Sequence, residues 1–419
     1  MNSNFQAVNS WFKLTFRSLS KYNYRLWAIG SLVSNSGTWM QRIAQDWLVL
    51  TQLTQHSGTS VGIVMSLQFG PPILLMPWTG MVADKFDRRR LLIITQSALA
   101  VTSVSLGILV LTEIVTLWQV YLFAAIMGCI SAFDSPVRQT FVTELVGEAD
   151  LPNAVALNST LFNSAQLIGP AIAGVLIIAI GMGWLFVING LSFVAVIYSL
   201  MKLRKSELKP SAMNKSTNTG IIHGLRYLKG KPDLLIALTM LFILGTYGLN
   251  FPIFISTMAV TTFNGGPHLY GALSSCMAIG SVIGALYSAR SEHPRIRLLA
   301  YSALGFGVAG VIASLMPNIW LFGISLVALG ATAQTFTIST NSLVQLRTDP
   351  ALRGRVMAIY MAIFMGCTPL GAPLIGWIAD LYGPRWAIAI GAASGFIAAT
   401  IGLGFHLLRK SRTQTKTPT

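Results

Sequence analysis

Long runs of apolar residues alternate with short polar turns along almost the whole chain. A helix needs about 20 largely apolar residues to cross a bilayer, and twelve stretches meet that criterion. They are predicted at residues 25–50, 59–84, 90–112, 117–139, 152–180, 183–203, 233–261, 267–290, 296–316, 319–345, 354–381 and 384–408. The pattern therefore predicts an all-α membrane protein with twelve transmembrane helices.

Composition and charge agree with a membrane protein and fix its expected orientation. Only 10% of the residues are charged and 53% are hydrophobic, whereas charged residues approach a quarter of an ordinary soluble domain. The net charge of +16 would favour a nucleic-acid partner in a soluble protein. If the N-terminus is cytoplasmic, however, all but Arg42 and Arg385 of the 29 basic residues fall on the cytoplasmic side, as the positive-inside rule requires. We therefore expect both termini in the cytoplasm, contact with anionic lipid and no nucleic-acid partner.

The spans divide into two halves that repeat. The apolar pattern stops at 204–232, which predicts an N-terminal six-helix bundle at 1–203, a cytoplasmic linker and a C-terminal six-helix bundle at 233–419. At an offset of 202 residues, one set of residues recurs: Gly169, Gly174, Gly181 and Trp184 align with Gly371, Gly376, Gly383 and Trp386. Parallel six-span halves are typical of carriers whose site lies at the repeat interface and whose access alternates by rocking.

The first span carries a stripe of polar side chains. Asn35, Trp39, Arg42 and Asp46 are spaced 4, 3 and 4 residues apart, so they share one face of a helix. Charges at membrane depth are costly and normally face a protein interior or water. Two interpretations stay open: Arg42 and Asp46 form a structural ion pair, or Asp46 takes up and releases a coupling proton while Arg42 holds it ionised.

A charged hinge lies between the second and third spans. Residues 80–90 read G-M-V-A-D-K-F-D-R-R-R. This hinge resembles the loop between helices 2 and 3 of major facilitator superfamily transporters. The positions that match are Gly80, Asp84, Lys85, Arg88 and Arg89, while Asp87 stands where the pattern has glycine.

The resemblance implies a gating role for the hinge. It places Asp84 against the start of helix 11, near Gly354, and pairs Arg88 with Asp134, which lies close to Arg138 in the fourth span. A helix N-terminus favours an anion, which makes the first contact physically sensible. The alternative is a plain topology determinant with no role in gating.

The resemblance covers nearly the whole chain and is strongest with the branch that contains enterobactin-type siderophore exporters and multidrug efflux proteins. Besides the hinge, it is carried by residues 39–50 and 151–158. A partial copy of the drug exporters' glycine and proline motif, L-I-G-P-A-I-A-G, lies in the fifth span. The resemblance implies a protein of the bacterial inner membrane that exports a bulky, partly apolar small molecule by proton antiport. We expect it to be a monomer.

Neutral polar, aromatic and thioether side chains within the spans are candidates to line the substrate site. Any single one is more often a packing residue. As a set they are Asn35, Trp39, Gln68, Phe69, Asn163, Gln166, Tyr247, Asn250, Gln334, Phe336, Met361, Phe364 and Met365.

Two alternatives to export of a soluble molecule stay open. The same branch contains lysophospholipid flippases, and a membrane enzyme or sensor without transport is the second alternative. Against an enzyme, the G-x-G-x-x-G of residues 305–310 lies inside an apolar span, and the histidines and cysteines have no metal-ligand spacing. We expect no metal and no cofactor. Asp380, near the outer end of the eleventh span, is expected to be solvated beside Arg385.

Overall fold

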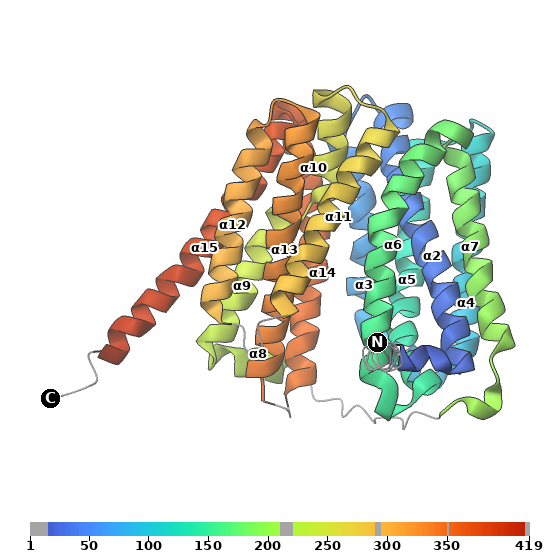
Figure 1. Cartoon of the computed structure of the whole chain (residues 1–419), viewed down its shortest axis with the longest axis horizontal. Coiled ribbons are helices and arrows are strands. Elements are labelled where there is room, and N and C mark those ends of the chain that lie inside the picture. Colours follow the sequence, from blue (N-terminus) through green and yellow to red (C-terminus); the bar gives the residue numbers. More distant parts are fainter. Residues whose placement is uncertain (1–15, 210–220, 290–294, 350–351, 415–419) are drawn as a thin grey trace, which may run out of the picture. The chain divides into compact units, whose positions relative to one another are not determined.

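The computed structural model describes residues 16–209, 221–289, 295–349 and 352–414, without the side chains at 77, 80, 81, 83–85, 221, 222 and 408–414. These residues form helices and no strands (Figure 1). In order, the elements are η1 (Arg17–Ser20), α2 (Tyr22–Leu48), η2 (Val49–Leu53), α3 (Gly58–Lys85), α4 (Arg88–Leu111), α5 (Leu117–Val146), η3 (Glu148–Asp150), α6 (Leu151–Ile180), α7 (Met182–Lys202), η4 (Lys205–Glu207), α8 (Ile221–Lys229), α9 (Pro232–Tyr247), α10 (Phe251–Thr257), η5 (Met258–Thr262), α11 (Pro267–Ala289), α12 (Ile296–Leu315), α13 (Ile319–Arg347), α14 (Arg353–Tyr382) and α15 (Pro384–Gln414).

The predicted all-α fold is confirmed, and a long helix accounts for each predicted span except the seventh. That span, predicted at 233–261, is divided into α9, α10 and η5, with a break at residues 248–250. Eleven helical stretches of the described chain are long and apolar enough to cross a membrane. The remaining span is α2, whose 27 residues include two arginines and Asp46, which lower its hydropathy. The main boundary error is in α5, predicted to end at 139 but continuing to Val146. Phe141, Val142 and Leu145 are buried there, so packing extends the helix beyond its apolar core.

By their contacts, the residues form two compact units. Unit 1 comprises Met1–Gln45 and Leu74–Ser216, and unit 2 comprises Asp46–Ile73 and Thr217–Thr419. Two helices, α2 and α3, are therefore divided, because the hairpin between Asp46 and Ile73 packs within unit 2. The bundles at 1–203 and 233–419 with a linker at 204–232 describe the order of the sequence and stay a prediction.

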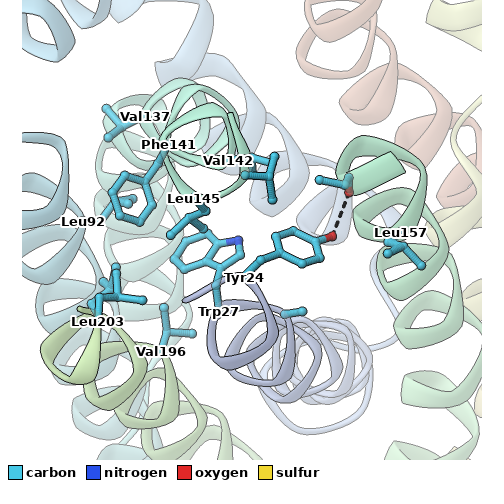
Figure 2. Packing of buried hydrophobic residues seen from close by; sticks show 14 residues of the cluster. Tyr24, Trp27, Leu92, Val137, Phe141, Val142, Leu145, Leu157, Val196 and Leu203 are labelled. Carbon is cyan, nitrogen blue, oxygen red and sulfur yellow. Dashed lines mark hydrogen bonds between the residues drawn. The ribbon is translucent and has the colours of Figure 1, made fainter. Parts of the chain in front are cut away.

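A cluster of large side chains holds one end of unit 1 together. Figure 2 shows Tyr24 and Trp27 of α2 packed among residues of α4, α5, α6 and α7. The Trp27 ring meets Phe141 edge to face, with centroids 5.6 Å apart. The Tyr24 hydroxyl donates to the carbonyl of Ala154 at 2.8 Å, the dashed line in the figure. Because lipid tails are as apolar as these side chains, close packing and such hydrogen bonds provide the helix association.

The repeated glycines have the same backbone roles in both halves. Gly181 ends α6 with φ of +85° and Gly383 ends α14 with φ of +92°, a conformation that residues with a Cβ rarely adopt. Gly169 of α6 lies against α2, where an added Cβ would be 2.7 Å from the Cβ of Trp39. Gly371 of α14 lies against α9 in the same way. Gly169 therefore lets α6, the fifth span of the first half, approach α2, the first span of that half. Gly371 lets α14, the fifth span of the second half, approach α9, the first span of that half.

The contact at Gly371 predicts a stability effect. An added Cβ would lie 1.6 Å from the carbonyl oxygen of Thr246, so Gly371→Ala must push α9 and α14 apart. We expect the free energy of unfolding to fall by about 1–3 kcal/mol. Thermal unfolding of the purified protein in detergent measures it. Gly404→Ala is the matched control, because nothing lies within 4 Å of that Cβ. Equal melting temperatures for the two variants would contradict the packing described here.

Candidate functional site

Asp46 is buried near the end of α2 and is held by unit 2. Its Oδ2 accepts a hydrogen bond of 2.7 Å from the hydroxyl of Tyr270, in the first turn of α11. The Tyr270 ring stacks on Trp47 with centroids 6.4 Å apart and planes 24° apart. Both members of the hydrogen bond are buried. A carboxylate at this depth therefore has a specific partner from a distant part of the sequence. The pairing of Arg42 with Asp46 stays a prediction.

Arg42 and Trp39 form a second feature of α2, within unit 1. The guanidinium carbon of Arg42 lies 4.8 Å from the centroid of the Trp39 ring, within the range of a cation–π contact. Trp39 also meets Phe162 of α6 edge to face, with centroids 5.8 Å apart. Gly169 allows this approach of α6. A positive charge and two aromatic rings are thus adjacent in unit 1.

Asp134 is the centre of a buried polar cluster in unit 1. Its Oδ1 accepts hydrogen bonds from Thr95 Oγ1 at 2.7 Å and Gln96 Nε2 at 2.8 Å. Its Oδ2 lies 3.1 Å from Nε of Arg138, one turn along α5. The Arg138 guanidinium also lies over the ring of Trp27, 5.4 Å from its centroid. This cluster joins α2, α4 and α5.

The predicted pairing of Arg88 with Asp134 is wrong. Arg88 instead pairs with Glu144, at 2.7 Å. Glu144 lies in the part of α5 beyond the predicted end of the span, and Asp134 is about 15 Å deeper along the helix at 1.5 Å per residue. Arg89 donates to the carbonyls of Leu200 and Met201, a favourable place for a cation at the end of α7.

The rest of the predicted gating set is only partly described. Of Gly80 and Asp84, only the backbone is described. The backbone there is helical, because α3 continues to Lys85. The contact of Asp84 with the start of α14 stays a prediction.

One buried polar group was missed by the sequence analysis. Gln41 Oε1 accepts hydrogen bonds from Ser103 Oγ and from Asn189 Nδ2, both at 2.5 Å. These residues lie on α2, α4 and α7, and all three are buried. A glutamine within an apolar span was a detectable signal, but it lies off the stripe that contains Arg42 and Asp46.

The predicted lining residues differ in their burial. Asn250 and Phe336 are fully buried, and Asn250 donates to the carbonyl of Thr246 at 2.7 Å, so both pack inside unit 2. Tyr247 is exposed. The half-buried members are Asn35, Trp39, Asn163 and Gln166 in unit 1, and Gln68, Phe69, Gln334, Met361, Phe364 and Met365 in unit 2. Half-buried side chains have surface available to a ligand, but the lining role stays a prediction.

Asp380 is exposed, as expected, but its predicted position beside Arg385 is wrong. Its carboxylate accepts hydrogen bonds from the first turn of α3, and Arg385 donates instead to the carbonyls of Ser314 and Met316 at 3.3 and 3.0 Å.

Among the described residues, no group of three histidine, cysteine, aspartate or glutamate side chains could hold a metal ion.

Comparison with known proteins identifies the family. The major facilitator model described as a transmembrane secretion effector matches residues 14–418. The chain belongs to the major facilitator superfamily. Superfamily relatives include the staphyloferrin A transporter of Staphylococcus aureus, 27% identical over 83% of this chain and 87% of its own length. The enterobactin exporter EntS of Shigella flexneri is 24% identical over 85% and 84%. The multidrug efflux pump Tap of Mycolicibacterium fortuitum is 26% identical over 84% and 88%.

Solved structures agree with the superfamily fold. The nucleoside transporter NupG, in a mutant form, covers 91% of this chain with 99% of its own, at a TM-score of 0.74 and 14% identity. A bacterial homologue of the lysosomal transporter Spinster, described as inward-facing and occupied, covers 91% with 96%, at a TM-score of 0.71 and 13% identity. At these identities the likeness shows the fold alone. The chain is a multi-pass transporter of the bacterial inner membrane.

The Asp134 cluster predicts how two substitutions combine. Arg138→Met leaves a carboxylate buried without its cation, which we expect to cost about 3–5 kcal/mol in unfolding free energy. Asp134→Leu together with Arg138→Met removes both charges and should cost less than Arg138→Met alone. Thermal unfolding of the purified variants gives the comparison. A double variant less stable than the single one would show that Asp134 is not held by its ion pair.

Proposed function

We propose that this transporter exports a bulky, partly apolar organic molecule, such as a siderophore or a drug, by proton antiport with alternating access. The observation that carries the proposal is similarity over most of the chain to proteins named as an enterobactin exporter and a multidrug efflux pump. Those names belong to the relatives, and their identities of 24% and 26% are low. The geometry of the described residues supports the proposal at two points.

The first point is Asp46 as the proton carrier. An ionised carboxylate in a membrane span is costly unless it has partners, and Tyr270 supplies one in this structure. If Asp46 leaves Tyr270 during the cycle, its ionised form loses a hydrogen-bond donor, so partner exchange and proton uptake are linked. One proton crossing a potential of 100 mV supplies about 2.3 kcal/mol. A single carboxylate is therefore sufficient for useful coupling.

The second point is the group formed by Trp39, Arg42 and Phe162. Aromatic faces suit the apolar part of a bulky ligand, and the adjacent guanidinium suits an acidic part. We include the half-buried lining residues and Tyr247 in the proposed substrate site and leave out Asn250 and Phe336, because those two are fully buried. We also propose that both termini lie in the cytoplasm, on the basis of the distribution of basic residues, and that the transporter acts as a monomer.

Export is tested by accumulation in a strain that lacks this protein. Siderophores, cationic dyes and lysolipids are compared as probes, with and without the protein restored. We expect restored protein to lower the cellular content of a siderophore or a dye. Lysolipid transfer between leaflets without export of either soluble probe would support the flippase instead. No change with any probe would oppose transport of these classes.

Proton coupling is tested with purified protein and the exported probe. Addition of the probe should release protons from the protein, as read by a pH indicator in weakly buffered solution. We expect Asp46→Asn to abolish this release, because the amide cannot lose a proton at these pH values. Glu113→Gln, in a predicted outer loop, is the matched control and should release protons like the parent protein. Full release from Asp46→Asn would exclude Asp46 as the carrier.

Tyr270 should act through Asp46. Tyr270→Phe keeps the ring stacked on Trp47 and removes only the hydroxyl. We expect proton-driven efflux to slow by about tenfold or more, because a hydrogen bond to a charged group contributes about 1.5–3 kcal/mol and about 1.4 kcal/mol is a factor of ten. In an Asp46→Asn background the same change should have little further effect. The measurement is the initial efflux rate in vesicles for four proteins: the parent, Tyr270→Phe, Asp46→Asn and the double variant. Equal losses in both backgrounds would mean that Tyr270 acts independently of Asp46.

A further inference from the structure

The start of α3 packs against α14 inside unit 2 through a face of small residues. Gly58, Gly62, Ser66 and Gly70 lie four residues apart and share one side of α3. A Cβ added to Gly62 would lie 2.4 Å from the carbonyl oxygen of Ala372. The contacts run in opposite directions along the two helices, because Gly58 meets Gly376 while Ser66 donates to the carbonyl of Pro369 at 3.0 Å. The helices are therefore antiparallel and in backbone contact.

Asp380, close to the end of α14, caps the first turn of α3. Its Oδ1 accepts from the N–H of Gly58 at 2.5 Å, and its Oδ2 accepts from the N–H of Thr59 at 3.0 Å. Oδ2 also accepts from the hydroxyls of Ser57, at 3.0 Å, and Thr59, at 2.5 Å. Backbone N–H groups in a first turn have no partner within their own helix, and the helix dipole favours an anion there. One carboxylate thus accepts from three donors in the first turn of α3 and from Ser57, the residue before it.

The sequence around Asp380 repeats the sequence of the charged hinge. Residues 376–380 read G-W-I-A-D and residues 80–84 read G-M-V-A-D. Gly383 and Arg385 then follow Asp380 at the spacings at which Asp87 and Arg89 follow Asp84. Asp84 lies as far along the chain from Gly58 as Asp380 lies from Gly354. The helices α3 and α14 therefore carry the same glycine and aspartate motif near their C-terminal ends.

We propose that Asp380 is a gating residue that fastens the segment 57–73 to α14 in one state of the transport cycle and releases it in the other. It is the counterpart, at the opposite end of the same helix pair, of the contact predicted between Asp84 and the start of α14. In the predicted orientation the Asp380 contact closes the outer side. The segment 57–73 belongs to the first six spans by sequence, and it leaves unit 2 when this contact opens. The proposal rests on the alternating access of the proposed function, but not on its proton coupling or substrate.

The exposed position of Asp380 fits reversible release. Its side chain lies at the surface of the protein, so water can replace the four donors when the contact opens. A buried carboxylate would instead have to lose its partners without replacement. The glycine face needs no rearrangement of side chains on separation, because its residues have almost none. Asp380 touches no substrate in this scheme and acts only through the position of α3.

The experiment measures the distance between the two helix ends in the full-length protein. Spin labels are attached to Gln55→Cys and Leu381→Cys, both exposed, after replacement of Cys129, Cys276 and Cys367. Double electron–electron resonance in lipid nanodiscs then gives the distance distribution without added substrate. We expect Asp380→Ala to shift the ratio of long to short distances by about tenfold, in line with the loss of a helix cap. An unchanged distribution would overturn the proposal.

Further variants separate the cap from general damage. Ser57→Ala with Thr59→Val removes only the two hydroxyl donors and should shift the distribution in the same direction by less. This double variant also tests the proposal if Asp380→Ala does not fold. An unchanged distance distribution in the double variant would then contradict the proposed role of the cap. Asp349→Ala removes another exposed carboxylate of unit 2 and should leave the distances unchanged. An equal shift in Asp349→Ala would show a general charge effect and overturn the specific role of Asp380.

The outcome is independent of the proton-release experiment. Asp46→Asn tests whether the chain carries protons at that carboxylate, and the spin-label distances test whether Asp380 sets the position of α3. Loss of proton coupling with an unchanged effect of Asp380→Ala would leave the gating role intact. Intact coupling with no effect of Asp380→Ala would remove only the gating role.

Discussion

The hydrocarbon core of a bilayer offers no hydrogen-bond partners, so a polar side chain of a membrane helix is costly there unless it finds a partner within the protein. This constraint applies most strongly to α2. Gln41 is satisfied in unit 1, by α4 and α7. Asp46, a little more than one turn later, is satisfied in unit 2, by α11. One helix thus contributes a buried polar side chain to each unit, and each of these side chains is hydrogen-bonded within its own unit.

Close approach of helices is the second requirement, and it depends on residues without side chains. Helices in a membrane gain little from burying apolar surface against one another, so their association relies on packing and on hydrogen bonds. Gly371 brings α14 to α9, and Gly62 brings α3 to α14. The helix α14 therefore contacts α9, which belongs to the second half of the sequence, and also α3, which belongs to the first half.

The sequence allowed the helices to be predicted far better than their partners. Length and hydropathy decide whether a segment spans a bilayer, and both are local properties, so the predicted spans agree with the helices apart from the break at residues 248–250 in the seventh. The partner of Arg88 was wrong because Glu144 lies in an amphipathic extension of α5 that hydropathy does not detect. The partners of Asp46 and Asp380 were not predicted, because Tyr270 and the first turn of α3 are far away from them in the sequence. Asp380 lies more than 300 residues from Ser57, and no local pattern joins them.

The division of α3 between the units fits the chemistry of its middle. The boundary falls between Ile73 and Leu74, immediately after G-P-P at residues 70–72, which lie inside the helix. Each proline removes one backbone hydrogen bond from a helix and favours a kink, and a preceding glycine eases it. If the segment 57–73 moves away from α14, bending of α3 at this point would leave its second part in place within unit 1. The two prolines thus lie next to the point at which α3 would bend if the segment 57–73 moved.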